Sequence, residues 1–296
     1  MRVEAAPWAR WIALISTMAL ALVGRASASD WPERVTFRSG DGKTVLVGYL
    51  FKSSPMPARR APAVVMMHGR AGAYSSGAEG VYDASTLSRR HRMWGELWAE
   101  SGYIALLVDG FGPRGYPRGF PRFSYHRRPP ELNEVTVRPL DAYGALAYLR
   151  SRRDVRPDRI GLQGWSNGGS AALAAMSADT RAIRPPATGF RAALVFYPAC
   201  GLKGRFADGY RPYAPVRIFH GTDDEEVSPR LCGGLVEKSR ALGGDIAIRF
   251  YEGATHGFDD PGRKRQRIRA NAAAFEDAVA RALRVFGREL EGKAGR

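Results

Sequence analysis

Short apolar runs of strand length alternate with longer segments of helical periodicity along most of the chain. Residues 35–39 and 45–51 flank Gly40-Asp41-Gly42 and predict an opening hairpin. Further strands are predicted at 63–67, 103–108, 159–163, 192–196, 216–219 and 246–250, and helices at 86–100, 134–150, 167–176, 230–242 and 266–286. This order predicts an α/β fold with a mainly parallel sheet and helices on both faces.

The first 28 residues have the pattern of a secretory signal peptide. Arg2 and Arg10 precede an apolar run over residues 11–24, and the small residues Ala26-Ser27-Ala28 follow it. About 14 apolar residues are fewer than the roughly 20 that span a bilayer. We therefore expect cleavage after Ala28 and a periplasmic or secreted protein without a transmembrane anchor. A retained N-terminal anchor is the alternative.

Residues 29–296 have the length of one large domain, and no linker rich in Gly, Ser or Pro divides them. The sequence predicts a single domain and a monomer. The formal net charge is +16, with basic stretches at 122–128 and 262–269. The second stretch runs into a helical pattern and is typical of a solvated helix face. No specific nucleic-acid partner is therefore predicted.

The chain has two cysteines, Cys200 and Cys232. An even number of cysteines in an exported protein favours a disulfide over two free thiols. No pair of His or Cys residues has the spacing of metal ligands, so neither a metal nor another cofactor is predicted.

The segment Gly164-Trp165-Ser166-Asn167-Gly168 follows a predicted strand and precedes a helix of small residues. In this context Gly-x-Ser-x-Gly indicates a nucleophile elbow, a turn too sharp for flanking side chains. Ser166 would lie at a helix N-terminus, where free N–H groups favour developing negative charge. The pattern predicts Ser166 as a catalytic nucleophile.

A serine nucleophile needs a base and a carboxylate that orients the base. Of the five histidines, only His256 follows the last predicted strand and precedes the closing helix. His68 and His220 also end strands and are interpreted as structural, whereas His91 and His126 are predicted to be exposed. The loop after residues 216–219 contains Asp223 and Asp224, and the residues alone do not separate these two acids.

Two backbone N–H groups are expected to hold the oxyanion. One belongs to Asn167, directly after the nucleophile. The other is predicted at Arg70, in the turn His68-Gly69-Arg70-Ala71-Gly72 after an early strand. The side chain of Arg70 is not needed for that role.

From about residue 40 to 285 the chain resembles the dienelactone hydrolase family of α/β-hydrolases. The matching segments are His68-Gly69, Asp109-Gly-Phe-Gly-Pro-Arg-Gly115, Gly164-Trp-Ser-Asn-Gly168, Gly221-Thr-Asp-Asp-Glu-Glu-Val227 and His256-Gly-Phe258. The resemblance implies the α/β-hydrolase fold, no cofactor and a small-molecule ester substrate. It assigns the acid to Asp224, three residues after Gly221 and three before Val227.

The chain departs from the family at the nucleophile, because the dienelactone-cleaving members use cysteine where this chain has Ser166. A serine indicates ordinary carboxylic esters, with lactones, polyesters and peptides as alternatives. The resemblance places Cys200 and Cys232 near one edge of the site, where a bridge would tether the acid loop. It also suggests a fixed role for Arg114, structural or facing the substrate; Trp165 is a second candidate for substrate contact.

Two other interpretations of the sequence are disfavoured. Gly110-Phe-Gly112-Pro-Arg-Gly115 fits a dinucleotide-binding pattern, but Pro113, Pro117 and Pro121 prevent the helix that such a site needs. A catalytically silent binding protein on the same fold is possible in principle, and a complete Ser, Asp and His set disfavours it. The Arg-rich segment 114–128 is expected either to cover the site or to be an exposed loop. If it covers the site, its aromatic residues would contact the acyl group of the substrate; they are Tyr116, Phe120, Phe123 and Tyr125.

Overall fold

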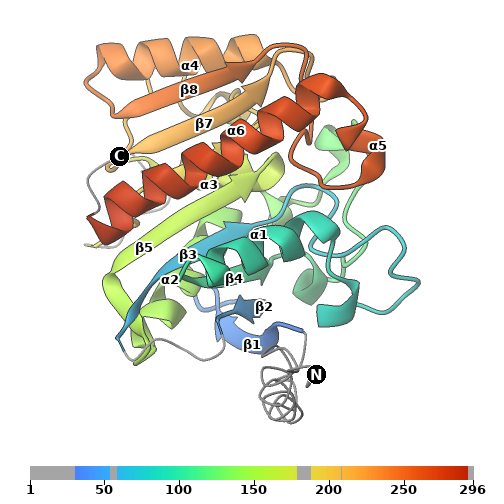
Figure 1. Cartoon of the computed structure of the whole chain (residues 1–296), viewed down its shortest axis with the longest axis vertical. Coiled ribbons are helices and arrows are strands. Elements are labelled where there is room, and N and C mark those ends of the chain that lie inside the picture. Colours follow the sequence, from blue (N-terminus) through green and yellow to red (C-terminus); the bar gives the residue numbers. More distant parts are fainter. Residues whose placement is uncertain (1–30, 54–58, 179–187, 208, 293–296) are drawn as a thin grey trace, which may run out of the picture. The chain divides into compact units, whose positions relative to one another are not determined.

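The computed structural model describes residues 31–53, 59–178, 188–207 and 209–292, which belong to one compact unit. The expected signal peptide, residues 1–28, lies outside the described residues. Within them, eight strands form one sheet in the order β1-β2-β4-β3-β5-β6-β7-β8 (Figure 1). The strands are β1 (Glu33–Arg38), β2 (Val45–Phe51), β3 (Ala61–Met67), β4 (Ile104–Asp109), β5 (Val155–Trp165), β6 (Ala193–Phe196), β7 (Val216–Gly221) and β8 (Ile246–Tyr251).

The sheet confirms the predicted hairpin and the mainly parallel topology. β1 and β2 pair antiparallel with Val35 opposite Gly48, and β2 also pairs antiparallel with β4. The remaining neighbours, from β4 through β3 and β5 to β8, are all parallel. The loops that follow β3, β5, β7 and β8 therefore leave the sheet at the same edge, which is where an α/β fold places its site.

Helices cover both faces of the sheet (Figure 1). The main helices are α1 (Arg89–Glu100), α2 (Arg138–Ser151), α3 (Asn167–Met176), α4 (Pro229–Ala241), the short α5 (Arg263–Gln266) and α6 (Arg269–Phe286). Within the described ranges, no helix combines the length and the apolar character needed to cross a membrane.

Three predicted helices begin later than expected, among them α6 at Arg269 instead of 266, and local capping explains the other two. α2 begins at Arg138 instead of 134, because Pro139 fits only the first turn of a helix. In front of it the side chain of Asn133 accepts from the N–H groups of Val135 and Thr136, which closes a turn. α1 begins after Ser88, whose hydroxyl accepts from the N–H of His91.

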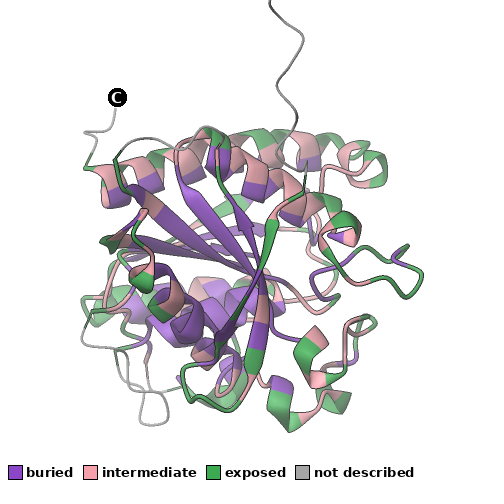
Figure 2. Cartoon of the chain, turned by 90° about the horizontal axis from the view of Figure 1, so that it is seen from below, coloured by how far each residue is buried: buried purple, intermediate pink, exposed green. Residues whose placement is uncertain are grey.

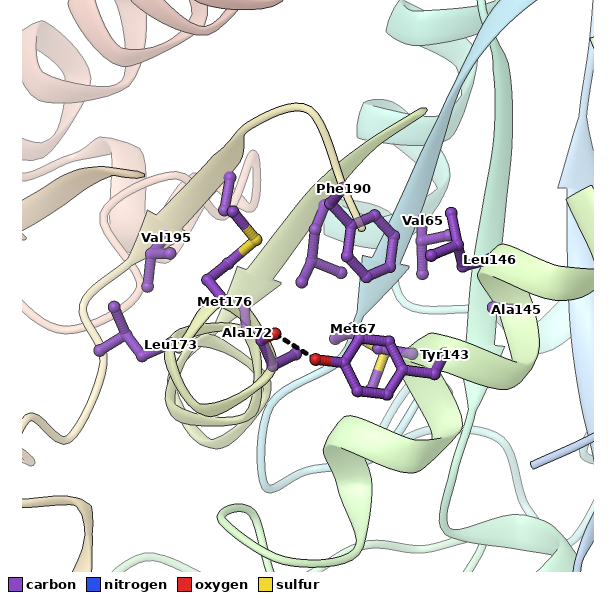
Figure 3. Packing of buried hydrophobic residues seen from close by; sticks show 14 of the residues in the cluster. Val65, Met67, Tyr143, Ala145, Leu146, Ala172, Leu173, Met176, Phe190 and Val195 are labelled. Atoms are coloured by element: carbon purple, nitrogen blue, oxygen red, sulfur yellow. Dashed lines mark hydrogen bonds between the residues drawn. The ribbon is translucent and has the colours of Figure 1, made fainter. Parts of the chain in front are cut away.

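The buried side chains form two clusters, one on each face of the sheet. One cluster contains residues of α2 and α3 against β3, β5 and β6, among them Val65, Tyr143, Leu146, Leu173 and Phe190 (Figure 3). The other contains Trp94 and Trp98 of α1 and Phe286 of α6. Figure 2 shows that the strands between these helices are buried along most of their length. Packing on both faces fixes the strand ends that carry the site.

Candidate active site

Ser166 lies at the turn between β5 and α3, in a backbone conformation that ordinary residues rarely adopt. Its φ is 51° and its ψ is −115°, and positive φ at a residue other than glycine costs about 1–3 kcal/mol. A Cβ atom at Gly164 would lie 2.3 Å from the carbonyl oxygen of Gly168, and one at Gly168 would lie 2.1 Å from that of Met67. Both glycines are therefore required by close backbone contacts around a strained serine.

His256 lies in the loop after β8 and pairs with Asp224 in the loop after β7. His256 Nδ1 is 2.8 Å from Asp224 Oδ2. The other carboxylate oxygen accepts the backbone N–H groups of Glu226 and Val227, each at 2.9 Å. His220 Nε2 lies 3.2 Å from Asp224 Oδ2. The structure thus brings His256 and Asp224 together, with His220 next to the carboxylate of Asp224.

Burial by itself would raise the pKa of the Asp224 carboxyl. The close His220 ring, the hydrogen bond with His256 and the N–H of Val227 outweigh that effect and hold the pKa of Asp224 well below its usual range. Asp224 is therefore a carboxylate at neutral pH. Asp223, the alternative that the residues alone left open, is exposed and accepts a hydrogen bond from the hydroxyl of Thr222.

The His256 loop is held on both sides by neighbouring side chains. The backbone N–H of His256 donates to Glu225 Oε2 at 2.9 Å, and that of Thr255 donates to Asn271 Oδ1 at 2.8 Å. The imidazole packs against the ring of Tyr197, with 4.6 Å between ring centroids. These contacts fix the ring plane of His256 relative to Asp224.

Ser166 and His256 line one cavity of about 330 Å³. Gly69 and Arg70 of the turn after β3 line it as well, and a Cβ at Gly69 would lie 3.4 Å from the Cβ of Ser166. Asn167 is the first residue of α3, so its N–H has no acceptor one turn earlier in the helix. The turn and the helix start therefore flank the serine, as the prediction for an oxyanion site at Asn167 and Arg70 requires.

Arg138 connects these two flanking segments, and the sequence analysis did not identify it. Its fully buried side chain donates from Nη1 to the carbonyl oxygen of His68 and to Asn167 Oδ1. Asn167 also donates from its amide nitrogen to Glu134 at 3.2 Å. Burial lowers the pKa of Arg138 to about 10. In the sequence, the only sign of a special role for Arg138 is a basic residue at this position of an apolar helical pattern.

Glu226 is a second residue that the sequence analysis missed. Arg70 Nε donates to its Oε2 at 2.7 Å and Arg70 Nη2 to its Oε1 at 2.9 Å, and Arg122 Nε lies 2.9 Å from Oε1. His256 Nε2 is 3.8 Å from Glu226 Oε2. The side chain of Arg70, which the prediction treated as dispensable, thus links the turn after β3 to the acid loop.

Five arginines line the cavity, and acids pair with four of them. Arg90 Nε lies 3.3 Å from Asp259 Oδ1, and Arg265 Nη1 donates to Glu225 at 3.1 Å. The five are Arg70, Arg89, Arg90, Arg122 and Arg265. Arg122 belongs to the Arg-rich segment 114–128, so part of that segment does border the cavity.

Neither Arg114 nor Trp165 lines the cavity that contains Ser166, so of the two roles open for Arg114 the structure favours the structural one. Arg114 forms a two-point ion pair with the buried Asp141, at 2.9 and 2.8 Å, and also donates to Gly110 O. Trp165 is fully buried, with its Nε1 2.7 Å from Asp259 Oδ2. Both are structural, since their polar atoms are used inside the protein.

His91 is also placed differently from the prediction. It is buried, at 3% exposure, and Nδ1 lies 3.0 Å from the carbonyl oxygen of Ala73. Burial lowers the pKa of His91 to about 4, so the ring is neutral at pH 7. Helical periodicity placed it on a charged helix, but α1 turns this position toward the loop that follows β3.

The predicted disulfide between Cys200 and Cys232 is present. It joins the segment after β6 to the first turns of α4, next to the acid loop. Among the described residues, no group of three or more His, Cys, Asp or Glu side chains could hold a metal ion.

Comparison with known proteins gives a family and a fold. The sequence model of the dienelactone hydrolase family matches residues 47–290. The putative hydrolase YtaP of Bacillus subtilis is 32% identical over 124 residues, which are 40% of each chain. A probable 2-oxo-3-(5-oxofuran-2-ylidene)propanoate lactonase of Bradyrhizobium is 25% identical over 61% of this chain and 72% of its own length.

Among solved structures, the apo form of Thermogutta terrifontis esterase 2 is similar with a TM-score of 0.63. The match has 21% identity and covers 90% of this chain and 97% of that chain. The same esterase with bound propionate is similar with a TM-score of 0.59, 23% identity, and coverage of 86% and 93%. At these identities the structural matches establish the fold, which is that of the α/β-hydrolases.

Proposed function

Because this chain belongs to the dienelactone hydrolase family, we propose that it hydrolyses carboxylic esters by nucleophilic catalysis at Ser166. The observation that carries the proposal is the pairing of His256 Nδ1 with a buried Asp224 at 2.8 Å, beside a cavity that Ser166 also lines. A strained serine, a base and a carboxylate in this arrangement have no evident structural purpose. They are the three groups that acyl transfer needs.

In the first half-reaction His256 Nε2 takes the proton from Ser166 Oγ while Oγ attacks the ester carbonyl carbon. The resulting oxyanion accepts hydrogen bonds from the N–H groups of Asn167 and Arg70. As the intermediate collapses, the bond to the alkoxy oxygen breaks, and the imidazolium gives its proton to the departing alcohol. Asp224 stabilises the imidazolium through Nδ1.

In the second half-reaction water attacks the acyl-enzyme. His256 accepts one proton from the water, and the carbonyl carbon again becomes tetrahedral over the same N–H groups. The bond to Ser166 Oγ then breaks, the proton returns to Oγ, and a carboxylic acid leaves. The cycle consumes one water and needs no cofactor.

The nucleophile points to ordinary esters as substrates. The lactonase of Bradyrhizobium and the esterase of Thermogutta are similar proteins that bear names for lactone and ester cleavage, and both reactions use the same half-reactions. The lining of the cavity holds five arginines against the two acids Glu226 and Asp260, and this excess of positive charge would also admit an anionic group. A panel of neutral and anionic esters of graded chain length distinguishes these classes.

Hydrolysis of p-nitrophenyl acetate tests the proposal. Ser166→Ala is expected to lower kcat by a factor on the order of 10⁶, and Asp224→Asn by roughly 10⁴. Two matched controls, Ser151→Ala at the exposed end of α2 and Asp223→Asn beside the acid, are expected to retain the wild-type rate. A rate that Ser166→Ala leaves unchanged would contradict the proposed function.

A further inference from the structure

A second cavity of about 610 Å³ adjoins the cavity that contains Ser166 and His256. Residues of the segment 70–76 line both cavities, among them Arg70 and Tyr74. The rest of the second cavity is lined by the loops around residues 78–82 and 117–121. Pockets for small molecules have volumes of roughly 300–1,000 Å³. A small acetyl ester would therefore occupy only part of the available space.

Aromatic side chains form the walls of this second cavity. The rings of Tyr74 and Tyr82 lie 5.3 Å apart, tilted by 57°. Phe120 belongs to the other lining loop, residues 117–121. Its ring is nearly perpendicular to that of Phe111, with 5.6 Å between the ring centroids. Arg118 Nε donates to the hydroxyl of Tyr82 at 2.9 Å, so the rim is polar. Such walls favour a flat ring over a chain or a saturated ring, since aromatic pairs have specific attractive geometries.

Hydrogen bonds hold the loop of Phe120 in a fixed position relative to the turn after β3, which contains Arg70. Phe120 donates its N–H to the carbonyl oxygen of Arg70, and Arg70 Nη1 donates to the carbonyl oxygen of Phe120, both at 2.8 Å. A Cβ at Gly119 would lie 2.3 Å from the carbonyl carbon of Ala71, so the two loops touch backbone to backbone. A ring bound beside Phe120 would therefore lie at a set distance from the reacting carbonyl group.

We propose that the site takes esters in which one half carries an aromatic ring, with the ester group at Ser166 and the ring between Tyr82 and Phe120. The inference rests on the proposed function, because it names the substrate of the same site. Binding energy from the ring positions the carbonyl carbon against Ser166 Oγ and raises kcat/KM.

Two pairs of esters that differ only in the ring test this inference, with acid release followed by pH-stat. Ethyl 3-phenylpropanoate is compared with ethyl 3-cyclohexylpropanoate for the acyl half. Acetate esters of 2-phenylethanol and 2-cyclohexylethanol are compared for the alcohol half. The aromatic member of at least one pair is expected to have a kcat/KM higher by about fivefold or more.

Substitutions in the cavity wall test whether the ratio of kcat/KM for the aromatic ester to kcat/KM for the saturated ester depends on this cavity. Tyr82→Leu and Phe120→Leu are each expected to bring the aromatic-to-saturated ratio close to one, whereas Tyr82→Phe keeps the ring and the ratio. Phe123→Leu is the matched control, because Phe123 is 74% exposed on the same segment as Phe120 and lines neither cavity.

The outcomes separate the two proposals. Ratios near one for both pairs in the wild-type protein, with hydrolysis that depends on Ser166, overturn the aromatic cavity and leave the esterase intact. An aromatic preference that persists in both leucine variants also overturns it. Absence of any hydrolysis that depends on Ser166 overturns the proposed function and this inference with it.

Discussion

Glu226 is the residue whose importance depends most on the folded chain. In the sequence it is one of four consecutive acids after Thr222, with no feature that distinguishes it. In the structure Arg70 and Arg122 hold its carboxylate 3.8 Å from His256 Nε2, the nitrogen that we propose takes the proton of Ser166. Burial raises the pKa of Glu226, but the hydrogen bond from Arg70 and the charges of His256, Arg70 and Arg122 lower it below the usual value.

We predict that Glu226→Gln lowers kcat/KM about tenfold, which corresponds to about 1.4 kcal/mol. The variant removes a negative charge beside the imidazolium that forms during acylation, and it weakens the anchor of the Arg70 turn. The loss should fall on kcat more than on KM, because the removed charge stabilises an imidazolium that forms only after the ester has bound. The charged groups around His256 are Asp224, Glu225, Glu226, Arg90 and Arg265.

The measurement is kcat and KM for p-nitrophenyl acetate at pH 7, with Glu252→Gln as control. Glu252 is exposed in the turn after β8, so its neutralisation should leave both constants unchanged. A purely structural role for Glu226 would lower the melting temperature without lowering kcat relative to KM.

At the scale of elements, the pattern of apolar runs located the strands well and the helix starts less well. β2 and α3 have the predicted bounds, whereas α1 and α2 begin three and four residues late. Buried strands are defined by their own apolar residues, but a helix start depends on capping by particular side chains such as Ser88. β5 extends through Gly164 and Trp165 because the chain stays paired with β6 up to the elbow.

The turn at Ser166 leaves no space for a side chain at position 168, which can be tested by substitution. We predict that Gly168→Ala destabilises the protein by about 3 kcal/mol, the upper part of the range for overpacking. The added methyl group would meet the backbone carbonyl groups of Met67 and His68, at 2.1 and 2.4 Å, and backbone moves less readily than side chains. Urea denaturation followed by circular dichroism measures the change.

Gly287→Ala is the matched control for this substitution. Gly287 follows α6 with a φ of −56°, and a Cβ there would have no described atom within 4 Å beyond its own helical turn. Its replacement should leave the midpoint of unfolding unchanged or raise it slightly. Equal midpoints for both variants would show that the elbow tolerates a side chain at 168.

At the scale of the whole molecule, the N-terminal pattern, the disulfide and the charge bear on where the protein works. We propose that it is exported and that residues 29–296 form one mature α/β-hydrolase domain. The bond between Cys200 and Cys232 suits an oxidising compartment. Residues 1–28 carry +2 of the formal net charge of +16, so the mature domain has a net charge of +14, which favours association with anionic surfaces at low ionic strength.

We predict that expression with the native N-terminus in a Gram-negative host yields a periplasmic protein that begins at Ser29. Cleavage after Ala28 follows from the small residues at 26–28. Intact-mass measurement of the periplasmic fraction gives the new terminus and shows whether two hydrogen atoms are missing through the disulfide. A cell-bound protein that still carries residues 1–28 would instead support a retained anchor.

The sequence by itself determined the fold class, the strand order along the chain, and Ser166, Asp224 and His256 as candidates. Local patterns sufficed because buried strands need continuous apolar residues, the elbow needs glycines at 164 and 168, and a family resemblance resolved the choice between Asp223 and Asp224. The roles of Arg114 and Trp165 stayed open because a sequence does not show which way a loop or strand residue faces.

Only the tertiary structure decided how segments far apart in the chain are joined around the site. Arg138 of α2 connects the turn after β3 with the start of α3, and Glu226 after β7 holds Arg70 after β3. The wall of the second cavity likewise needs the loops of Tyr82 and Phe120 to meet. Such contacts depend on the relative placement of elements, which packing of the whole chain sets and no local pattern encodes.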